Sequence, residues 1–209
     1  DQDVTEALKL LAEWNGEMNE HLPEPLIFYS WMRKLQQRLT QDELGVLSKE
    51  FSNFEPLFLE RVFRDIDGAS QWCDVLQSIP VEKCETIAEL ALYDAISELR
   101  EQYKLKMNSL RWGDVHIAMH DHLTLGHIPL LNVLINLRQS VSGGDYTLMR
   151  GLSSGNEYKP FENVHAAVYR GIYDFSDPDS SLYVISTGQS GHLFSRHYDD
   201  LGQLWRRGE

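Results

Sequence analysis

The feature that most constrains this chain is a change of pattern near residue 110. Residues 1–110 contain three of the fourteen glycines and carry a net charge of −10, whereas residues 111–209 contain eleven glycines and carry −3. Charged, glycine-poor sequence with spaced apolar residues is typical of surface helices, and glycine marks the turns between strands. We therefore expect a helical region over 1–110 and a strand-rich region over 111–209, within one folded unit.

Apolar residues recur at helical spacing through the first region, and we expect these stripes to form the core. Pro23 and Pro25 suit the first turn of a helix. Capping boxes at Thr40–Glu43 and Thr86–Glu89 predict two helix starts. The stripes are Val4, Ala7, Leu8, Leu10, Leu11 and Trp14; Leu26, Ile27, Trp31, Leu35 and Leu39; Leu57, Phe58, Val62, Phe63 and Ile66; and Ile87, Leu90, Ala91, Ala95, Ile96, Leu99 and Tyr103.

The second region changes to strand-like alternation. Val115, Ile117 and Met119 alternate with His116, Ala118 and His120, which predicts a strand. An apolar run over Pro129–Leu137 predicts a helix. Further strands are predicted at Tyr146–Met149, Ala167–Tyr173 and Leu182–Ser186, with a turn at Asp177–Ser180. Helices followed by strands predict an α+β fold.

The charge of the chain limits its partners. A net charge of −13 argues against nucleic acid and anionic membrane surfaces, because both favour basic patches. No apolar run approaches the ~20 residues that a membrane span requires. We therefore expect no nucleic-acid partner and no membrane partner.

The sequence contains two cysteines, Cys73 and Cys84. As free thiols they would be small buried hydrophobic residues. As a pair they would close a short loop around Pro80, stabilise the fold by ~2–3 kcal/mol and imply an oxidising compartment. The residues by themselves leave both alternatives open.

Several histidines lie close together in sequence, a pattern that metal sites use. On a strand, His116 and His120 are ~13 Å apart, so only His120 and His122 would be close enough to share an ion, with His127 following. We expect these histidines to have hydrogen-bonding or packing roles and not to ligate a metal.

Two C-terminal segments contain candidate hydroxyl nucleophiles. Ser190 lacks the spacing of a nucleophile elbow, because Gly191 follows it directly. Ser195, His197 and the two following aspartates lie within six positions and can rarely converge as a triad. We expect a glycine-rich turn, then a final helix capped by Asp199 or Asp200 with an apolar face of Leu201, Leu204 and Trp205. No catalytic or cofactor-binding residue is expected.

The same segments resemble the C-terminal end of the penicillin acylase family, the N-terminal-nucleophile amidases that include penicillin, cephalosporin and acyl-homoserine-lactone acylases. The specific pair of motifs is Gly188-Gln189-Ser190-Gly191 and His197-Tyr198-Asp199-Asp200, before Leu204-Trp205. Weaker similarities follow the family's order along the whole chain, at Trp14–Met18, Trp72–Asp74, Cys84–Thr86, Arg111–His116, Gly143–Thr147 and Tyr169–Asp179.

The resemblance implies an enzyme that hydrolyses a linear amide bond in a small acyl-amide or acyl-homoserine-lactone type of substrate. Such enzymes are four-layer αββα sandwiches made as precursors that cleave themselves into an α chain and a β chain. The N-terminal Ser of the β chain is the nucleophile and its α-amino group is the base. A backbone N–H and an Asn side chain form the oxyanion hole.

This sequence starts with Asp1 where the family's β chain starts with Ser, and it matches only the C-terminal portion of that chain. The nucleophile, the oxyanion hole and the calcium ligands map upstream, so no catalytic or metal-binding residue is carried over. We expect the α chain and the N-terminal part of the β chain as partners, and no activity from this chain alone. Leu123 and Leu193 stand where the family commonly has Pro. The resemblance also favours a Cys73–Cys84 disulfide and a periplasmic or secreted location.

Two other hypotheses belong to different classes. One is a stand-alone structural or binding domain without catalytic activity. The other is a small histidine-rich metalloenzyme. An upstream coding region would exclude the first, and elemental analysis without bound metal would exclude the second.

Overall fold

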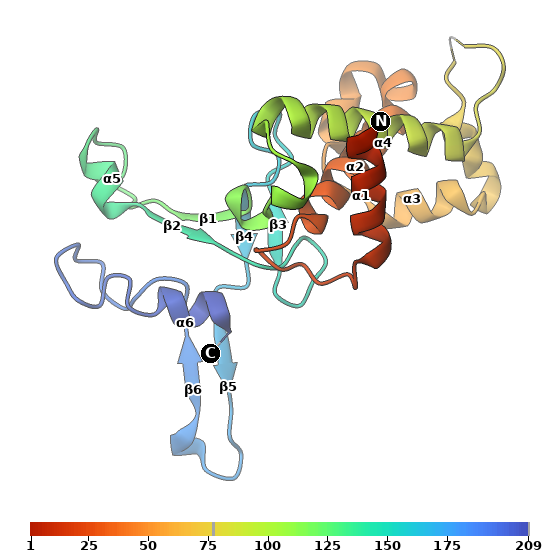
Figure 1. Ribbon diagram of the computed structural model, residues 1–209. Helices are drawn as coiled ribbons and strands as arrows, with labels where there is room; N and C mark the ends of the chain where they lie inside the picture. Colours follow the sequence, from red (N-terminus) through yellow and green to blue (C-terminus); the bar gives the residue numbers. More distant parts are fainter. Residues whose placement is uncertain (77, 209) are drawn as a thin grey trace. The chain divides into compact units, whose positions relative to one another are not determined.

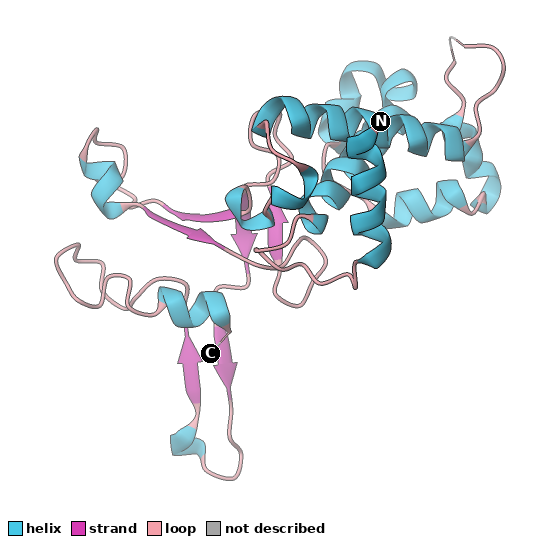
Figure 2. Ribbon diagram, in the orientation of Figure 1, coloured by secondary structure: helices cyan, strands magenta, loops and turns pink. Residues whose placement is uncertain are grey.

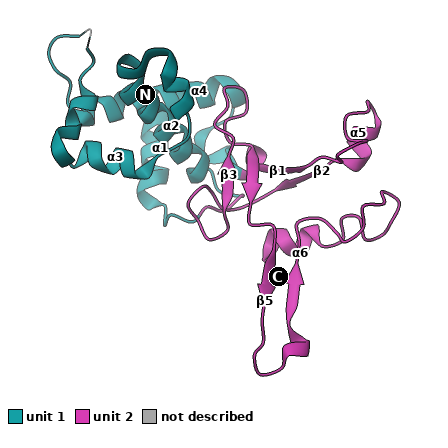
Figure 3. Cartoon of the chain, turned by 180° about the vertical axis from the view of Figure 1, so that it is seen from behind, with its two compact units in different colours: residues 1–17, 21–112 teal, residues 18–20, 113–209 magenta. Residues whose placement is uncertain are grey.

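The computed structural model describes residues 1–76 and 78–208, which divide into two compact units (Figure 3). Unit 1 comprises residues 1–17 and 21–112, and unit 2 comprises residues 18–20 and 113–209. Unit 1 is built from helices, whereas the named strands lie in unit 2 (Figure 2). The fold is therefore α+β, as predicted.

Unit 1 contains four α-helices, α1 (Gln2–Glu13), α2 (Glu24–Leu44), α3 (Pro56–Phe63) and α4 (Cys84–Tyr103), in the described part of the chain (Figure 1). Short 3₁₀ helices, η1 (Gly45–Phe51), η2 (Ile66–Cys73) and η3 (Met107–Ser109), connect or follow them. A further 3₁₀ turn, η4 (Trp112–Asp114), lies where the two units meet in sequence.

The core of unit 1 lies where α2 and α4 pack together. Its buried residues are Leu35, Leu39, Leu59, Val62, Cys73, Ile87 and Ala91. Around it, Trp31 Nε1 donates to Ala88 O at 2.8 Å, and Arg38 Nε pairs with Asp94 Oδ2 at 2.6 Å. The apolar stripes predicted for α2 and α4 therefore largely form the core, whereas Leu57 is 75% exposed, contrary to prediction.

Both predicted capping boxes are wrong. Thr40 lies inside α2, where its hydroxyl donates to Gln36 O at 2.9 Å, because a helical Thr can bond the carbonyl four residues before it. The helix continues until Gly45, whose φ of 52° is readily adopted only by glycine. Helix α4 begins at Cys84, two residues before Thr86, and Lys83 at its N-cap makes no side-chain capping bond.

A disulfide joins Cys73 at the end of η2 to Cys84 at the start of α4, with the Cα atoms 5.0 Å apart. This is the pairing that the family resemblance implies. The bond closes the loop between the two elements and fixes η2 against the core, since Cys73 is 1% exposed.

Unit 2 contains a four-stranded sheet with the order β2-β1-β4-β3. The strands are β1 (Ile117–His120), β2 (Leu137–Ser140), β3 (Gly151–Ser153) and β4 (Asn163–Ala166). Strand β1 runs antiparallel to β2 and parallel to β4, and β3 runs antiparallel to β4. Ala118, Val141, Val184 and Trp205 form a buried apolar cluster in this unit.

A separate antiparallel hairpin pairs β5 (Arg170–Ile172) with β6 (Leu182–Val184), and η5 (Pro178–Ser180) lies at the predicted turn between them (Figure 1). The other helices of unit 2 are α5 (Leu131–Ile135) and α6 (Gly202–Arg207). No helix in the described part of the chain has the length and apolar character needed to cross a membrane.

Several predicted boundaries in the second region are wrong. Tyr146–Met149 is not a strand, because the chain turns there and β3 starts only at Gly151. Helix α5 is shorter than predicted, and β2 begins at Leu137, one residue after the C-cap position is reached at Asn136. The final helix starts at Gly202, and its N-cap is Leu201 without a side-chain bond, so neither Asp199 nor Asp200 caps it.

Candidate functional site

A small hollow in unit 2 brings together the histidine segment and the C-terminal motif. It has a volume of about 220 Å³. One wall is the end of β1 with the residues after it, together with Leu137 of β2. The other wall is the segment Thr187–Gly191 with Tyr198. The lining residues are His120, Asp121, His122, Leu137, Thr187, Gly188, Gln189, Ser190, Gly191 and Tyr198.

The two halves of the C-terminal motif lie against each other. Ser190 N donates to His197 O at 2.9 Å, and Leu201 N donates to Thr187 O at 2.9 Å. A Cβ at Gly188 would collide with the carbonyl oxygen of His197 and lie 2.7 Å from Asp200 Oδ1. Glycine is therefore required at position 188 for the two segments to approach this closely.

Tyr198 anchors this wall of the hollow to the rest of unit 2. Its hydroxyl donates to Ile135 O, at the end of α5, at 2.7 Å. The neighbouring His197 pairs through Nδ1 with Asp200 Oδ2 at 2.6 Å, and its Nε2 accepts from Arg196 Nε at 3.0 Å. The motif residues thus hold one another and the α5 segment in place.

Neither predicted hydroxyl candidate is bonded to an imidazole in the described structure. Ser190 Oγ accepts from His192 N at 3.2 Å, and Ser195 Oγ accepts from His197 N at 3.1 Å. Both are local turns in which a hydroxyl accepts from the backbone two residues later. The pairing of His197 with Asp200 is consequently a structural contact with no hydroxyl in line.

The two histidines of the hollow have different surroundings. Burial lowers the pKa of His120, and the nearby positive charge of Arg138 lowers it further, so its imidazole is neutral at pH 7. His122 Nδ1 accepts from Thr124 N at 3.3 Å and from Leu125 N at 3.2 Å. The accepting Nδ1 leaves Nε2 of a neutral His122 ring as the protonated nitrogen.

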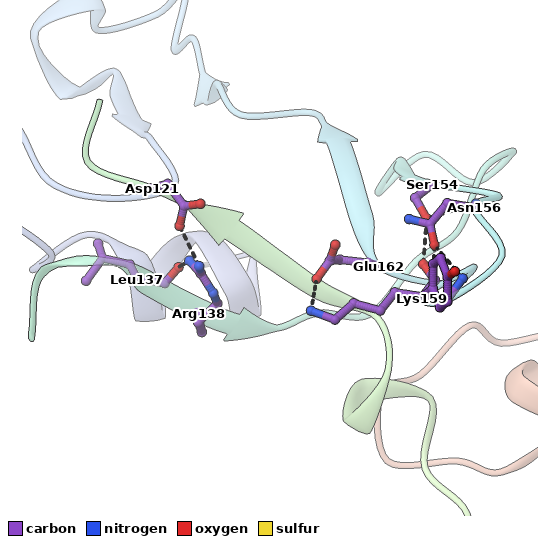
Figure 4. Close-up of polar contacts among 8 residues, drawn as sticks. Asp121, Leu137, Arg138, Ser154, Asn156, Lys159 and Glu162 are labelled. Carbon is purple, nitrogen blue, oxygen red and sulfur yellow. Dashed lines mark hydrogen bonds and ion pairs between the residues drawn. The ribbon is translucent and has the colours of Figure 1, made fainter. Parts of the chain in front are cut away.

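Asp121 lies between these histidines in sequence and pairs with β2. Its Oδ1 is 2.5 Å from Arg138 Nη2 (Figure 4). In the same view, Lys159 Nζ pairs with Glu162 Oε1 at 3.1 Å, and Asn156 Oδ1 accepts from Lys159 N at 2.6 Å. The charges of Asp121 and Glu162 are therefore paired, and the other residues that line the hollow are neutral donors, acceptors or apolar groups.

The other histidine candidates lie elsewhere. His116 is fully buried, and its Nδ1 donates to Phe161 O at 2.8 Å. Burial lowers its pKa to about 4. His127 does not line the hollow. Of the four histidines, His120 and His122 line the hollow.

A polar cluster that the sequence pattern does not predict joins distant parts of unit 2. Glu20 Oε1 accepts from Arg206 Nε at 3.1 Å and from Nη2 at 2.9 Å, and Glu20 Oε2 accepts from the Ser140 hydroxyl. The backbone of the short segment Met18–Glu20 is also held, because Gly143 N donates to Met18 O at 2.7 Å and Gly113 N donates to Glu20 O at 2.8 Å. Nothing in the local sequence pattern indicates a contact between residues 186 positions apart.

A second missed contact fixes the base of the β5–β6 hairpin on α6. The Arg170 guanidinium lies 4.6 Å from the centre of the Trp205 ring and also donates to Trp205 O. Trp205 Nε1 in turn donates to Ala167 O at 3.0 Å. Trp205, which was predicted as an apolar residue of the final helix, therefore anchors the base of the β5–β6 hairpin to α6.

Comparison with known proteins identifies similarity along the full length. The family model described as penicillin amidase matches residues 1–209. The chain is 25% identical to an acyl-homoserine lactone acylase, QuiP, of Pseudomonas syringae pv. tomato over 99% of its length, which is 26% of that relative. It is 29% identical to the penicillin acylase 2 proenzyme of Pseudomonas sp. strain SE83 over 54% of its length and 14% of that relative.

A QuiP acylase of Pseudomonas syringae pv. syringae is also 25% identical over 98% of the chain. The chain spans about a quarter of the length of these two QuiP relatives. The full-length match agrees with the ordered series of motifs. Of the C-terminal pair, Gly188–Gly191 and Tyr198 line the hollow described above.

Proposed function

Because the chain belongs to the penicillin amidase family, whose model matches it from residue 1 to residue 209, we propose that it is the C-terminal part of an enzyme that hydrolyses a linear amide bond. The observation that carries this proposal is the match over the whole chain, with acylases among the similar proteins. The substrate class follows the names of those relatives: a small acyl-amide or an acyl-homoserine lactone.

The proposed nucleophile is an N-terminal Ser that lies upstream of this chain in a longer protein. Its α-amino group acts as the base, and the resulting alkoxide attacks the amide carbonyl. A backbone N–H and an Asn side chain, also upstream, stabilise the tetrahedral intermediate. The residues of this chain then support the site, which is consistent with the structural roles of Ser190, Ser195 and His197.

The proposed partners are the α chain and the N-terminal part of the β chain, with which this chain completes an αββα sandwich. The β5–β6 hairpin supports the proposal, because an isolated two-stranded hairpin is marginal in water. Its apolar residues are widely exposed, at 74% for Ile172, 71% for Leu182 and 95% for Phe175. Further strands packing on this hairpin would bury them.

A periplasmic or secreted location is part of the proposal. The disulfide between Cys73 and Cys84 supports it, because disulfides persist in oxidising compartments. Calcium in the whole enzyme, bound by ligands upstream of this chain, stays a prediction from the family resemblance.

The test is to isolate the longer protein that contains this chain and to follow release of a chromogenic aniline from acyl-anilides. We expect a processed β chain whose N-terminal residue is Ser, identified by mass spectrometry of its first peptide. Replacing that Ser by Ala should abolish turnover. Residues 1–209 alone should release no aniline.

The outcome also distinguishes the amidase proposal from the hypothesis of a stand-alone structural or binding domain. If the gene encodes no upstream segment, or if the processed chain turns over the anilide without an N-terminal nucleophile, the proposal is wrong. A missing upstream segment would favour a stand-alone structural or binding domain, whereas turnover without an N-terminal nucleophile would require a different catalytic mechanism. The acyl group is identified in the same assay by comparing aromatic, long aliphatic and dicarboxylate acyl chains.

A further inference from the structure

Unit 1 contains a larger hollow that the amidase function does not use. Its volume is about 630 Å³, within the range of pockets that hold small organic ligands. It is bounded by α2, η1, the loop before α3, and Trp72 of η2. Its lining is mainly apolar, with Leu44, Phe51, Phe58 and Trp72 as the apolar members.

The wall between η1 and α3 is fixed by one buried amide. Gln36 of α2 is 1% exposed, and its Nε2 donates to both Phe51 O and Asn53 O. Its Oε1 accepts from Glu55 N at 2.8 Å. Three bonds from one buried side chain hold the loop 51–55 in a defined conformation, so this wall is formed before any ligand arrives.

The opposite wall is fixed by an aromatic pair and the disulfide. Trp72 and Phe58 meet edge to face with ring centroids 5.3 Å apart. Cys73, the next residue after Trp72, is bonded to Cys84 at the start of α4. A pocket with walls held in this way loses little conformational entropy when a ligand binds, which favours affinity.

The polar residues of the lining supply carboxylates and hydrogen-bond acceptors. Glu50 and Glu55 are exposed members of the lining, and neither forms an ion pair among the described residues. Asn53 Oδ1 is an acceptor in the wall without a hydrogen-bond partner in the described structure. The described lining contains no Lys, Arg or His. An apolar pocket with carboxylates at its edge favours a cation over an anion of the same shape.

We propose that this hollow between α2, η1, α3 and η2 is a binding site for a small amphiphilic amine, with an aromatic or aliphatic body between Phe51, Phe58 and Trp72 and an ammonium group beside Glu50 and Glu55. The apolar body is removed from water by the aromatic walls. The ammonium group donates hydrogen bonds to the carboxylate oxygens of Glu50 and Glu55, which form no ion pair among the described residues. The proposal is independent of the amidase chemistry, because it uses no residue of the hollow in unit 2.

The experiment titrates the 209-residue chain with 3-phenylpropylamine and, separately, with 3-phenylpropionate, which has the same ring and the opposite charge. Backbone NMR shifts locate the site, and their dependence on ligand concentration gives the Kd. We expect shifts confined to residues of α2, η1, the loop before α3, α3 and η2. We also expect the amine to bind at least tenfold more tightly than the carboxylate.

The matched variants test the charge argument without disturbing the core. The double variant Glu50→Gln/Glu55→Gln should reduce the preference for the amine at least threefold. Glu43→Gln/Glu89→Gln removes the same charge from exposed helix positions outside the lining and should leave the preference unchanged. Equal affinity for both probes, no binding of the amine, or equal effects of the two double variants would each overturn the proposal.

A further arm uses the longer protein that contains this chain. Binding of the amine to that protein, with the same variant effects, supports the proposal. Loss of binding there would show that another segment of the protein fills the hollow, and it would overturn the assignment to a free ligand. Amide hydrolysis measured in parallel should not change with Glu50→Gln/Glu55→Gln, so this failure is distinguishable from failure of the amidase proposal.

Discussion

Two glycines of one motif differ in what they require of their surroundings. A side chain at Gly188 would meet the backbone of His197, whereas a Cβ at Gly191 would meet no atom within 4 Å. We expect Gly188→Ala to destabilise unit 2 by about 2 kcal/mol, since overpacking against backbone forces the segments apart. Gly191→Ala, the matched control, should change stability by less than about 0.5 kcal/mol. Urea unfolding compares them, and equal effects would contradict the close approach at Gly188.

The buried His116 predicts a pH dependence of stability. Its pKa is about 4 in the folded chain, because burial disfavours the charged ring, while an unfolded His has its ordinary value near 6.5. Between these values the unfolded chain binds more protons, so stability is full above pH 6.5 and falls as the pH drops to about 4. The full loss corresponds to about 3 kcal/mol.

The measurement is the urea midpoint of the chain and of His116→Asn from pH 7.5 to pH 4. The Asn side chain can replace the Nδ1–H donor to Phe161 O but does not titrate. The variant should lose less stability than the wild-type chain over this range. Carboxylates whose pKa values are lowered, such as Asp65 and Asp174, contribute equally to both proteins and cancel in the difference. Parallel curves would show that His116 is not the titrating group.

The buried ion pair of Glu20 with Arg206 predicts a loss of stability when Glu20 is replaced. Its side chain is 10% exposed and that of Arg206 is 27% exposed. Removing one partner of a buried pair leaves an uncompensated charge, so Glu20→Ala should destabilise unit 2 by about 3 kcal/mol. The double variant Glu20→Ala/Arg206→Leu should cost less than the sum of the two single variants. The exposed Glu157→Ala is the control and should be nearly neutral.

At the scale of elements, the disulfide links η2 to α4 across a sequence separation of 11 residues. The loop-entropy model gives about 3 kcal/mol for a loop of this length. We expect reduction, or Cys73→Ala/Cys84→Ala, to lower the urea stability of unit 1 by about that amount and to leave unit 2 unchanged. Two thiols should react with iodoacetamide only after reduction. A reductant effect on the double variant would show that another cause is at work.

The sequence predicts elements well where one period dominates a segment. The stripe from Ile87 to Leu99 identifies α4, because five of its members, Ile87, Ala91, Ala95, Ile96 and Leu99, are buried. Short strands are predicted less well. Strand β4 (Asn163–Ala166) was missed because its residues Asn163, Val164, His165 and Ala166 show little alternation, and it is defined by pairing with β3 and β1.

The candidate site was only partly predictable for the same reason. The motif Gly188–Gly191 and the pair His120 and His122 stand out in the sequence, but their meeting across the hollow depends on the sheet and on Tyr198 reaching Ile135 O. Capping was predicted from local chemistry alone. It was wrong at Thr40 because the tertiary packing of α2 extends that helix through the apparent start signal.

At the scale of the whole molecule, the segment Met18–Glu20 belongs to unit 2 although it lies between two parts of unit 1 in sequence. A shortened chain of residues 113–209 would therefore lack Glu20 and its backbone partners for Gly113 and Gly143. We expect faster amide hydrogen exchange in β2 and α6 of that chain than in the 209-residue chain. Adding a synthetic peptide of residues 14–24 should slow the exchange again. Identical exchange in all three samples would contradict a role for the segment.

The pairing of Glu20 with Arg206 also sets an order of events during synthesis. The ribosome adds about 5–20 residues each second, so Arg206 emerges roughly 10–40 s after Glu20. During that interval the Glu20 carboxylate and Ser140 of β2 have no contact with Arg206, because α6 has not yet been synthesised. Unit 1 has all its residues by position 112 and is free to fold first. Unit 2 can form the Glu20–Arg206 contact only after residue 206 has emerged, so its fold is completed later than that of unit 1.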